Sequence, residues 1–139
     1  MINNLKNKVR KSTLRSLYYS FIYPYLDYNI INWSNAPKTT LNCLRKSNRK
    51  AIKTILSANN NAHFPPLFKE LEILPLNELI KYRRGTYMYK LTKNLLPASA
   101  HNWFKKNNSN ASVRLNRFYI PNPRTEYAKR NHTYGSTKL

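Results

Sequence analysis

The sequence predicts an all-α fold: a small helical bundle, then a further helix and an extended, irregular C-terminal tail. Three long segments repeat apolar residues at spacings of three and four, which is the period of one helical face. No stretch alternates apolar and polar residues for long enough to build a sheet. Prolines and asparagine-rich runs separate the segments. We therefore expect a basic helical region over 1–57, a second helical region over 63–106 and a basic tail over 107–139.

A first helix is predicted over residues 13–33. Its interior proline, Pro24, should kink or split it, because proline removes a backbone donor. The apolar stripe contains Leu14, Leu17, Tyr18, Phe21, Ile22, Tyr25, Leu26, Ile30 and Trp33. This spacing favours core packing of the aromatic side chains over stacking on nucleic-acid bases. Tyr18, Tyr25 and Trp33 are thus expected to pack against the following helix, after a turn at 35–37.

A second helix is predicted over residues 39–56, followed by a polar loop at 57–62 that is the best internal boundary. At 100° per residue one face carries apolar side chains, and cations lie beside it. The apolar residues are Leu41, Leu44, Ala51, Ile52 and Ile55, and the cations are Arg45, Lys46, Arg49, Lys50 and Lys53. The segment contains no acidic residue to form i, i+4 pairs with them.

The rest of the chain predicts shorter elements around one more long helix. Pro65 and Pro66 begin a helical turn over 67–71, and a third helix follows over 76–95 with a stripe ending at Leu91. A short helix is expected over 98–106. Beyond it the periodicity disappears, and we expect an extended tail with one short strand at 117–120.

The composition points to a polyanionic partner. The 139 residues include 25 Lys and Arg against 5 Asp and Glu, which gives a formal net charge of +20. So large an excess repels itself unless anionic charge is nearby, and nucleic acid is the commonest source. AT-rich codons would explain part of the lysine excess, although not the shortage of acids. The aromatic content of 13% argues against a disordered basic tail.

The residues that catalysis or metal binding would need are missing or scattered. Two-metal nucleotidyl transfer requires clustered carboxylates, and a zinc site requires His and Cys at close spacing. The acids are Asp27, Glu70, Glu72, Glu78 and Glu126, and the possible soft ligands are Cys43, His63, His101 and His132. We therefore expect no catalytic residue, metal, cofactor or small-molecule substrate.

Sequence features also bear on location. One cysteine allows no internal disulfide, and no signal peptide is apparent. Polar residues such as Pro24 and Asp27 interrupt the most apolar stretch, 17–33, and argue against a membrane span. An intracellular location, the nucleus included, is the expectation.

Nucleic-acid binding is expected first at Arg45, Lys46, Arg49, Lys50 and Lys53, with their helix docked by its apolar face. An ordinary solvated charged face is the alternative. Arg15 in the basic leader is a further candidate. In the tail, Arg114 and Arg124 alternate with aromatic residues, a combination that suits single-stranded nucleic acid. A tail wrapped onto its own domain would show the same pattern.

Several motifs together resemble a known family. Residues 17–28 (LYYSFIYPYLDY), followed by 33–35 (WSN), resemble the region just after the polymerase core in reverse transcriptases of non-LTR, LINE-like and jockey-like retrotransposons. Further matches are 50–53 (KAIK), 66–71 (PLFKEL), 73–74 (IL), 87–90 (YMYK), 95–97 (LLP), 119–121 (YIP), 124–125 (RT) and 134–135 (YG). The sequence departs from the family pattern at Ser34, Ser47, Asn48 and Lys53.

The resemblance implies a thumb-like region that grips a template–primer duplex behind an active site. The family's catalytic Tyr-Ala-Asp-Asp hairpin lies upstream of this region and is absent from this sequence. The resemblance thus implies a non-catalytic, nucleic-acid-binding fragment of an RNA-directed DNA polymerase, whose protein partner is the upstream polymerase region. Two alternatives remain: a small basic structural RNA-binding protein, and an inert truncated pseudogene product that does not fold alone.

Overall fold

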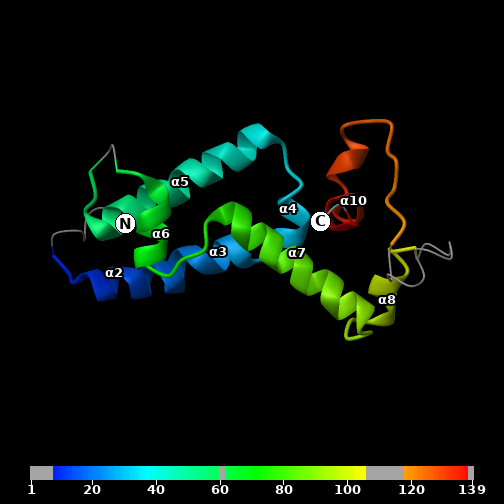
Figure 1. Cartoon of the computed structure of the whole chain (residues 1–139), viewed down its shortest axis with the longest axis horizontal. Helices are drawn as coiled ribbons and strands as arrows, with labels where there is room; N and C mark the ends of the chain where they lie inside the picture. The colour runs from blue at the N-terminus through cyan, green and yellow to red at the C-terminus, as the bar shows by residue number, and fades with distance from the viewer. Residues whose placement is uncertain (1–7, 60–61, 106–117, 138–139) are drawn as a thin grey trace. The chain divides into compact units, whose positions relative to one another are not determined.

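The computed structural model describes residues 8–59, 62–105 and 118–137, and this part of the chain is helical with no β-strand (Figure 1). The prediction of an all-α fold is confirmed. The elements are α2 (Lys11–Leu17), the π-helix η1 (Tyr18–Ile22), α3 (Tyr23–Asp27), α4 (Ile30–Trp33), α5 (Lys38–Leu56), α6 (Phe64–Glu70), α7 (Leu76–Thr92), α8 (Ala98–His101), the 3-10 helix η2 (Ala128–Arg130) and α10 (His132–Thr137).

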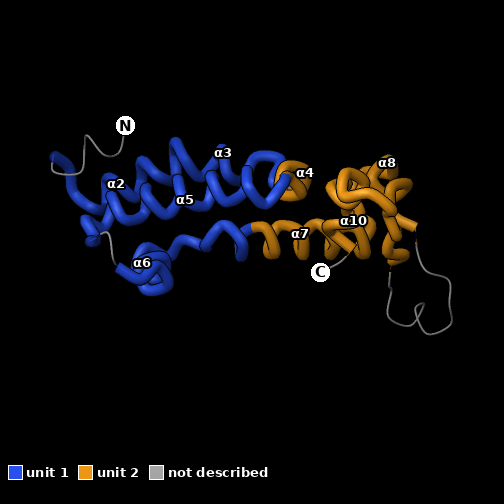
Figure 2. Tube along the Cα trace, turned by 90° about the horizontal axis from the view of Figure 1, so that it is seen from above, with its two compact units in different colours: residues 1–30, 37–79 blue, residues 31–36, 80–139 orange. Residues whose placement is uncertain are grey.

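The chain forms two compact units, which are coloured separately in Figure 2. Unit 1 consists of Met1–Ile30 and Pro37–Leu79, and unit 2 consists of Ile31–Ala36 and Ile80–Leu139. These units divide the chain differently from the predicted regions 1–57, 63–106 and 107–139. The division falls inside α7, so one continuous helix contributes its first residues to unit 1 and the remainder to unit 2.

A kink or a split was expected at Pro24, but the first helix of unit 1 instead widens into a π-helical turn just before it. The Tyr23 N–H donates to the Tyr18 carbonyl, five residues back, and η1 joins α2 to α3. A proline inside an α-helix would lack its own donor and clash with the carbonyl four residues earlier. A π-turn relieves this conflict, and Pro24 then occupies the first turn of α3. The helix ends before Asn29, whose φ is 50°.

The π-turn also explains why the core prediction was wrong for Tyr25. An extra residue in one turn rotates everything after it by about 100° around the helix axis. The buried positions are therefore Leu14 in α2, Tyr18 at the start of η1 and Leu26 in α3. Ile30, in α4 beyond Asn29, is also buried. Tyr25 lies on the outer side with 83% of its surface exposed.

Helix α5 runs antiparallel to the α2–η1–α3 segment and buries one face against it (Figures 1 and 2). Ile52 and Ile55 are fully buried, and Leu41 is nearly so. The one polar residue buried on this face is Asn48, whose Oδ1 accepts a 2.9 Å hydrogen bond from the Tyr18 hydroxyl. A buried polar atom needs such a partner, so Tyr18 and Asn48 fix how the two helices meet.

Replacing Tyr18 with Phe should destabilise the protein by about 1–3 kcal/mol, because the Asn48 amide would stay buried without its donor. Burial raises the pKa of Tyr18. The folded state thus keeps the phenol neutral while the unfolded chain ionises, and stability should fall as the pH rises above about 10. Urea unfolding at pH 7 and pH 11 measures both effects. A variant as stable as wild type, with the same alkaline loss, would contradict this role.

Helix α6 and the loop after it complete unit 1. Phe68, Leu71 and Ile73 are buried there, and so is Leu76 at the start of α7. Glu72 adopts a left-handed backbone conformation, with φ of 54°, and its carboxylate accepts a 2.8 Å hydrogen bond from Arg15. The Tyr19 hydroxyl donates to the Glu72 carbonyl at 3.2 Å. Two side chains of the first helical segment therefore hold the loop that leads into α7.

Unit 2 is organised around Phe104 and Arg84. Phe104 is buried, and its ring lies near those of Tyr87, Phe118 and His132. Arg84 is half-buried, a position that lowers its pKa. Its guanidinium donates to Ser34 Oγ, Asn35 Oδ1 and the Gly135 carbonyl. A Cβ on residue 135 would lie 2.1 Å from Asn35 Oδ1, so glycine permits this close approach.

Three further expectations fall in unit 2. Trp33 is only half-buried, so its place in the core is partial. The tail, predicted to be extended, ends in η2 and α10. Its predicted strand at 117–120 begins outside the described residues, and the part described makes a single contact of strand type, with the Tyr119 N–H donating to the Lys105 carbonyl at 2.8 Å.

Candidate nucleic-acid interface

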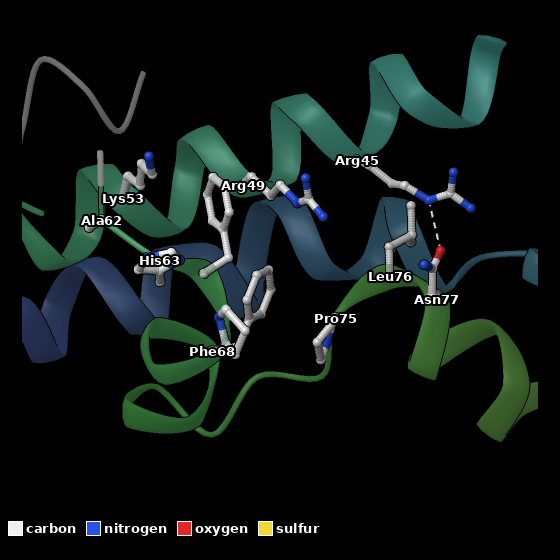
Figure 3. A pocket seen from close by; sticks show the side chains of 11 residues that line it. Arg45, Arg49, Lys53, Ala62, His63, Phe68, Pro75, Leu76 and Asn77 are labelled. Carbon is white, nitrogen blue, oxygen red and sulfur yellow. Dashed lines mark hydrogen bonds between the residues drawn. The ribbon is translucent and has the colours of Figure 1, made fainter. Parts of the chain in front are cut away.

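A groove of about 500 Å³ lies within unit 1 (Figure 3). Helix α5 forms one wall and contributes Arg45, Arg49 and Lys53. The segment entering α6 and the start of α7 provide the rest of the lining: Ala62, His63, Phe64, Pro65, Phe68, Pro75, Leu76 and Asn77. None of the described residues that line the groove is an Asp or Glu. Its electrostatic character is therefore cationic, on a largely apolar base.

Arg45 spans the groove from one wall to the other. Its Nε donates to Asn77 Oδ1 at 2.7 Å, and its Nη1 donates to Asn42 Oδ1 at 2.7 Å. Figure 3 shows the side chain extending from α5 to the start of α7. Both acceptors are neutral amides, which orient the guanidinium without cancelling its charge. Arg45 can thus still attract an anion with donors that these two bonds do not use.

Phe64 positions the other two cations. The Arg49 guanidinium carbon lies 4.7 Å from the centre of the Phe64 ring, and Lys53 Nζ lies 4.4 Å from it. Cation–π contacts at partly exposed sites contribute about 0.5–1 kcal/mol each. One aromatic ring at the start of α6 therefore holds two α5 cations at the groove while leaving their positive charge intact.

The structure divides the five predicted α5 cations into two sets. Arg45, Arg49 and Lys53 line the groove, as their four-residue spacing on one flank allows. Lys46 and Lys50 are exposed and do not line it. We call these sets the groove cations and the outer cations. They present positive charge in two directions from one helix.

The remaining predicted residues lie elsewhere. Arg15 is bonded to Glu72, and this hydrogen bond raises its pKa, so its charge is already paired. Arg124 is exposed in unit 2. Arg114 lies outside the described residues. Arg15, which belongs to unit 1, is not among the residues that line the groove.

Sequence reasoning missed the other half of the groove. His63 and Phe64 lie between the predicted loop at 57–62 and the predicted turn at 67–71, and Asn77 lies at the start of the helix predicted over 76–95. Nothing in their local spacing indicates that they face α5. The loop predicted at 57–62 marks where the helix ends but does not indicate which later segment packs against it. Tertiary packing of α6 on α5 supplies the rest.

The described residues show no cluster of three or more His, Cys, Asp or Glu side chains that could hold a metal ion. Over the same residues, no helix has both the length and the apolar content to cross a bilayer. Comparison with protein-family models, curated proteins and solved structures gives no match. The geometry and charge of unit 1 are therefore the observations that point to an interface.

Proposed function

We propose that this chain is a non-catalytic nucleic-acid-binding segment that contacts a template–primer backbone through α5. By resemblance, it would belong to the thumb and post-polymerase region of a non-LTR retrotransposon reverse transcriptase. The upstream polymerase region would be its protein partner. The motifs at 17–28 and 33–35 support the family, and the charge of α5 supports the binding.

The groove is the observation that carries the proposal. Three cations, Arg45, Arg49 and Lys53, follow one another at about 6 Å intervals along the axis of α5. An ordinary solvated helix face mixes charges of both signs, whereas α5 has no acid over Lys38–Leu56. Side chains in such a row suit successive phosphates of one strand, and phosphate contacts supply most sequence-independent affinity.

Salt dependence tests the proposal directly. The substrate is a fluorescent template–primer, a duplex with a single-stranded template overhang, and the measurement is anisotropy between 50 and 400 mM NaCl. Each phosphate contact contributes a slope of about −0.7 to −0.9 in log K against log salt. Five α5 contacts thus predict a slope of about −3.5 to −4.5. Affinity should differ little between unrelated sequences, because backbone contacts carry no base information.

Two outcomes would contradict the proposal. If no binding were measured at 50 mM NaCl, nucleic acid would not be the partner. A slope near zero with measurable binding would show that the contact is not to phosphates. Circular dichroism on the same preparation, with the strong helical signal of the described fold, controls for folding.

A further inference from the structure

The groove is too small a space for a double helix to enter. Its volume, about 500 Å³, falls in the range of about 300–1,000 Å³ typical of small-ligand sites. A duplex resting on unit 1 would meet the exposed outer cations, Lys46 and Lys50, and the exposed Arg49 more readily than the interior of the groove. A nucleotide that is not base-paired has a size and flexibility that allow it to enter.

The lining offers two kinds of contact at once. Arg45 and Arg49 supply guanidinium donors suited to a phosphate. Across from them lies Pro75, which is half-buried, and the buried side chains of Phe68 and Leu76 close the bottom of the groove. Asn77 accepts from Arg45 through Oδ1, so its Nδ2 donors are what its amide can offer a base edge. A nucleotide has a part for each wall: a phosphate for the cations and a flat base for the apolar surface.

The site is also largely ordered before any ligand arrives. The Arg45–Asn77 hydrogen bond joins the two walls, and the Phe64 ring holds Arg49 and Lys53 in place. Immobilising a long side chain on binding costs about 0.5–1.5 kcal/mol. Cations that are already held lose less entropy when they meet a phosphate.

We propose that this groove binds one unpaired nucleotide of a single strand, with the phosphates on its two sides at Arg45 and Arg49 and its base against Pro75, above the buried Phe68. The outer cations would contact the backbone of the flanking duplex. This inference rests on the proposed function, and it adds a preference for an unpaired overhang over a blunt end.

The test compares a blunt duplex with the same duplex carrying a short overhang, for wild type and two matched variants. Because base contacts of this kind contribute about 1–3 kcal/mol, wild type should bind the overhang about 5- to 150-fold tighter. R45Q/R49Q should remove most of this preference. K46Q/K50Q, which removes the same charge from the same helix, should weaken both ligands about equally and preserve the ratio.

An overhang that lacks its bases distinguishes the contribution of the base to binding from that of the phosphate. Its affinity in wild type should fall toward that of the blunt duplex. Equal wild-type binding of blunt and overhang ligands with a steep salt slope would overturn the nucleotide site and leave the proposed function standing. If neither ligand bound, both the nucleotide site and the proposed function would be overturned. A preference that survives in R45Q/R49Q, or survives the abasic change, would also overturn this site.

Discussion

On the proposed function, replacing the five clustered cations of α5, Arg45, Lys46, Arg49, Lys50 and Lys53, with Gln should weaken binding of a template–primer on the order of a thousandfold at 150 mM salt. Each lost phosphate contact removes about 0.7–0.9 from the slope of log K against log salt, so most of the salt dependence should vanish. Gln has nearly the helix propensity of Lys and Arg. Ile52 and Ile55 are untouched, and the fold should survive.

A second five-site variant distinguishes the effect of where the cations lie from the effect of the total charge of the protein. Gln at Lys69, Lys90, Lys93, Lys105 and Arg130, all exposed and outside α5, also lowers the net charge from +20 to +15. Anisotropy titrations of both variants should show a large loss for the α5 set and a modest one for the other. Equal losses would mean that bulk charge, and not α5, binds the polyanion.

Replacing Ile52 with Ala is expected to have the largest effect on stability, a loss of about 2–5 kcal/mol. Ile52 has no exposed surface and lies on the face of α5 that packs against the α2–η1–α3 segment. A small domain has only about 5–15 kcal/mol of stability in total. The variant should therefore show a much lower urea midpoint by circular dichroism.

Leu74→Ala serves as the matched control, because it shortens another aliphatic side chain of unit 1. Leu74 keeps 47% of its surface exposed and should lose well under half as much. If the two variants unfolded at the same urea concentration, the described packing of α5 would be wrong.

The strongest sequence signal gave the most accurate prediction. α5 was expected over 39–56 and is observed over Lys38–Leu56. Its long apolar period and the proline before it define both its face and its start. Its cations could be placed beside that face for the same reason. The period alone fixed which side chains lie together along one helix.

Features that depend on contacts between residues far apart in the sequence could not be predicted from local spacing. The π-turn at η1 shifts the buried register by one residue, and the period of an ordinary α-helix therefore placed Tyr25 inside. The groove needs Phe64 to meet Arg49, and no local pattern encodes that contact. In the tail, α10 is short and is anchored through Gly135 to Arg84, a side chain 51 residues away in sequence.

The row of cations on α5 also lowers the stability of the protein when no polyanion is bound. Like charges four residues apart destabilise a helix by about 0.2–0.5 kcal/mol for each pair, so Arg45, Arg49 and Lys53 oppose the helix that carries them. A bound polyanion removes that repulsion, and any ligand specific to the folded state stabilises it by mass action. Binding and folding are therefore thermodynamically linked: the charges that would recognise a nucleic acid lower the melting temperature of the free chain.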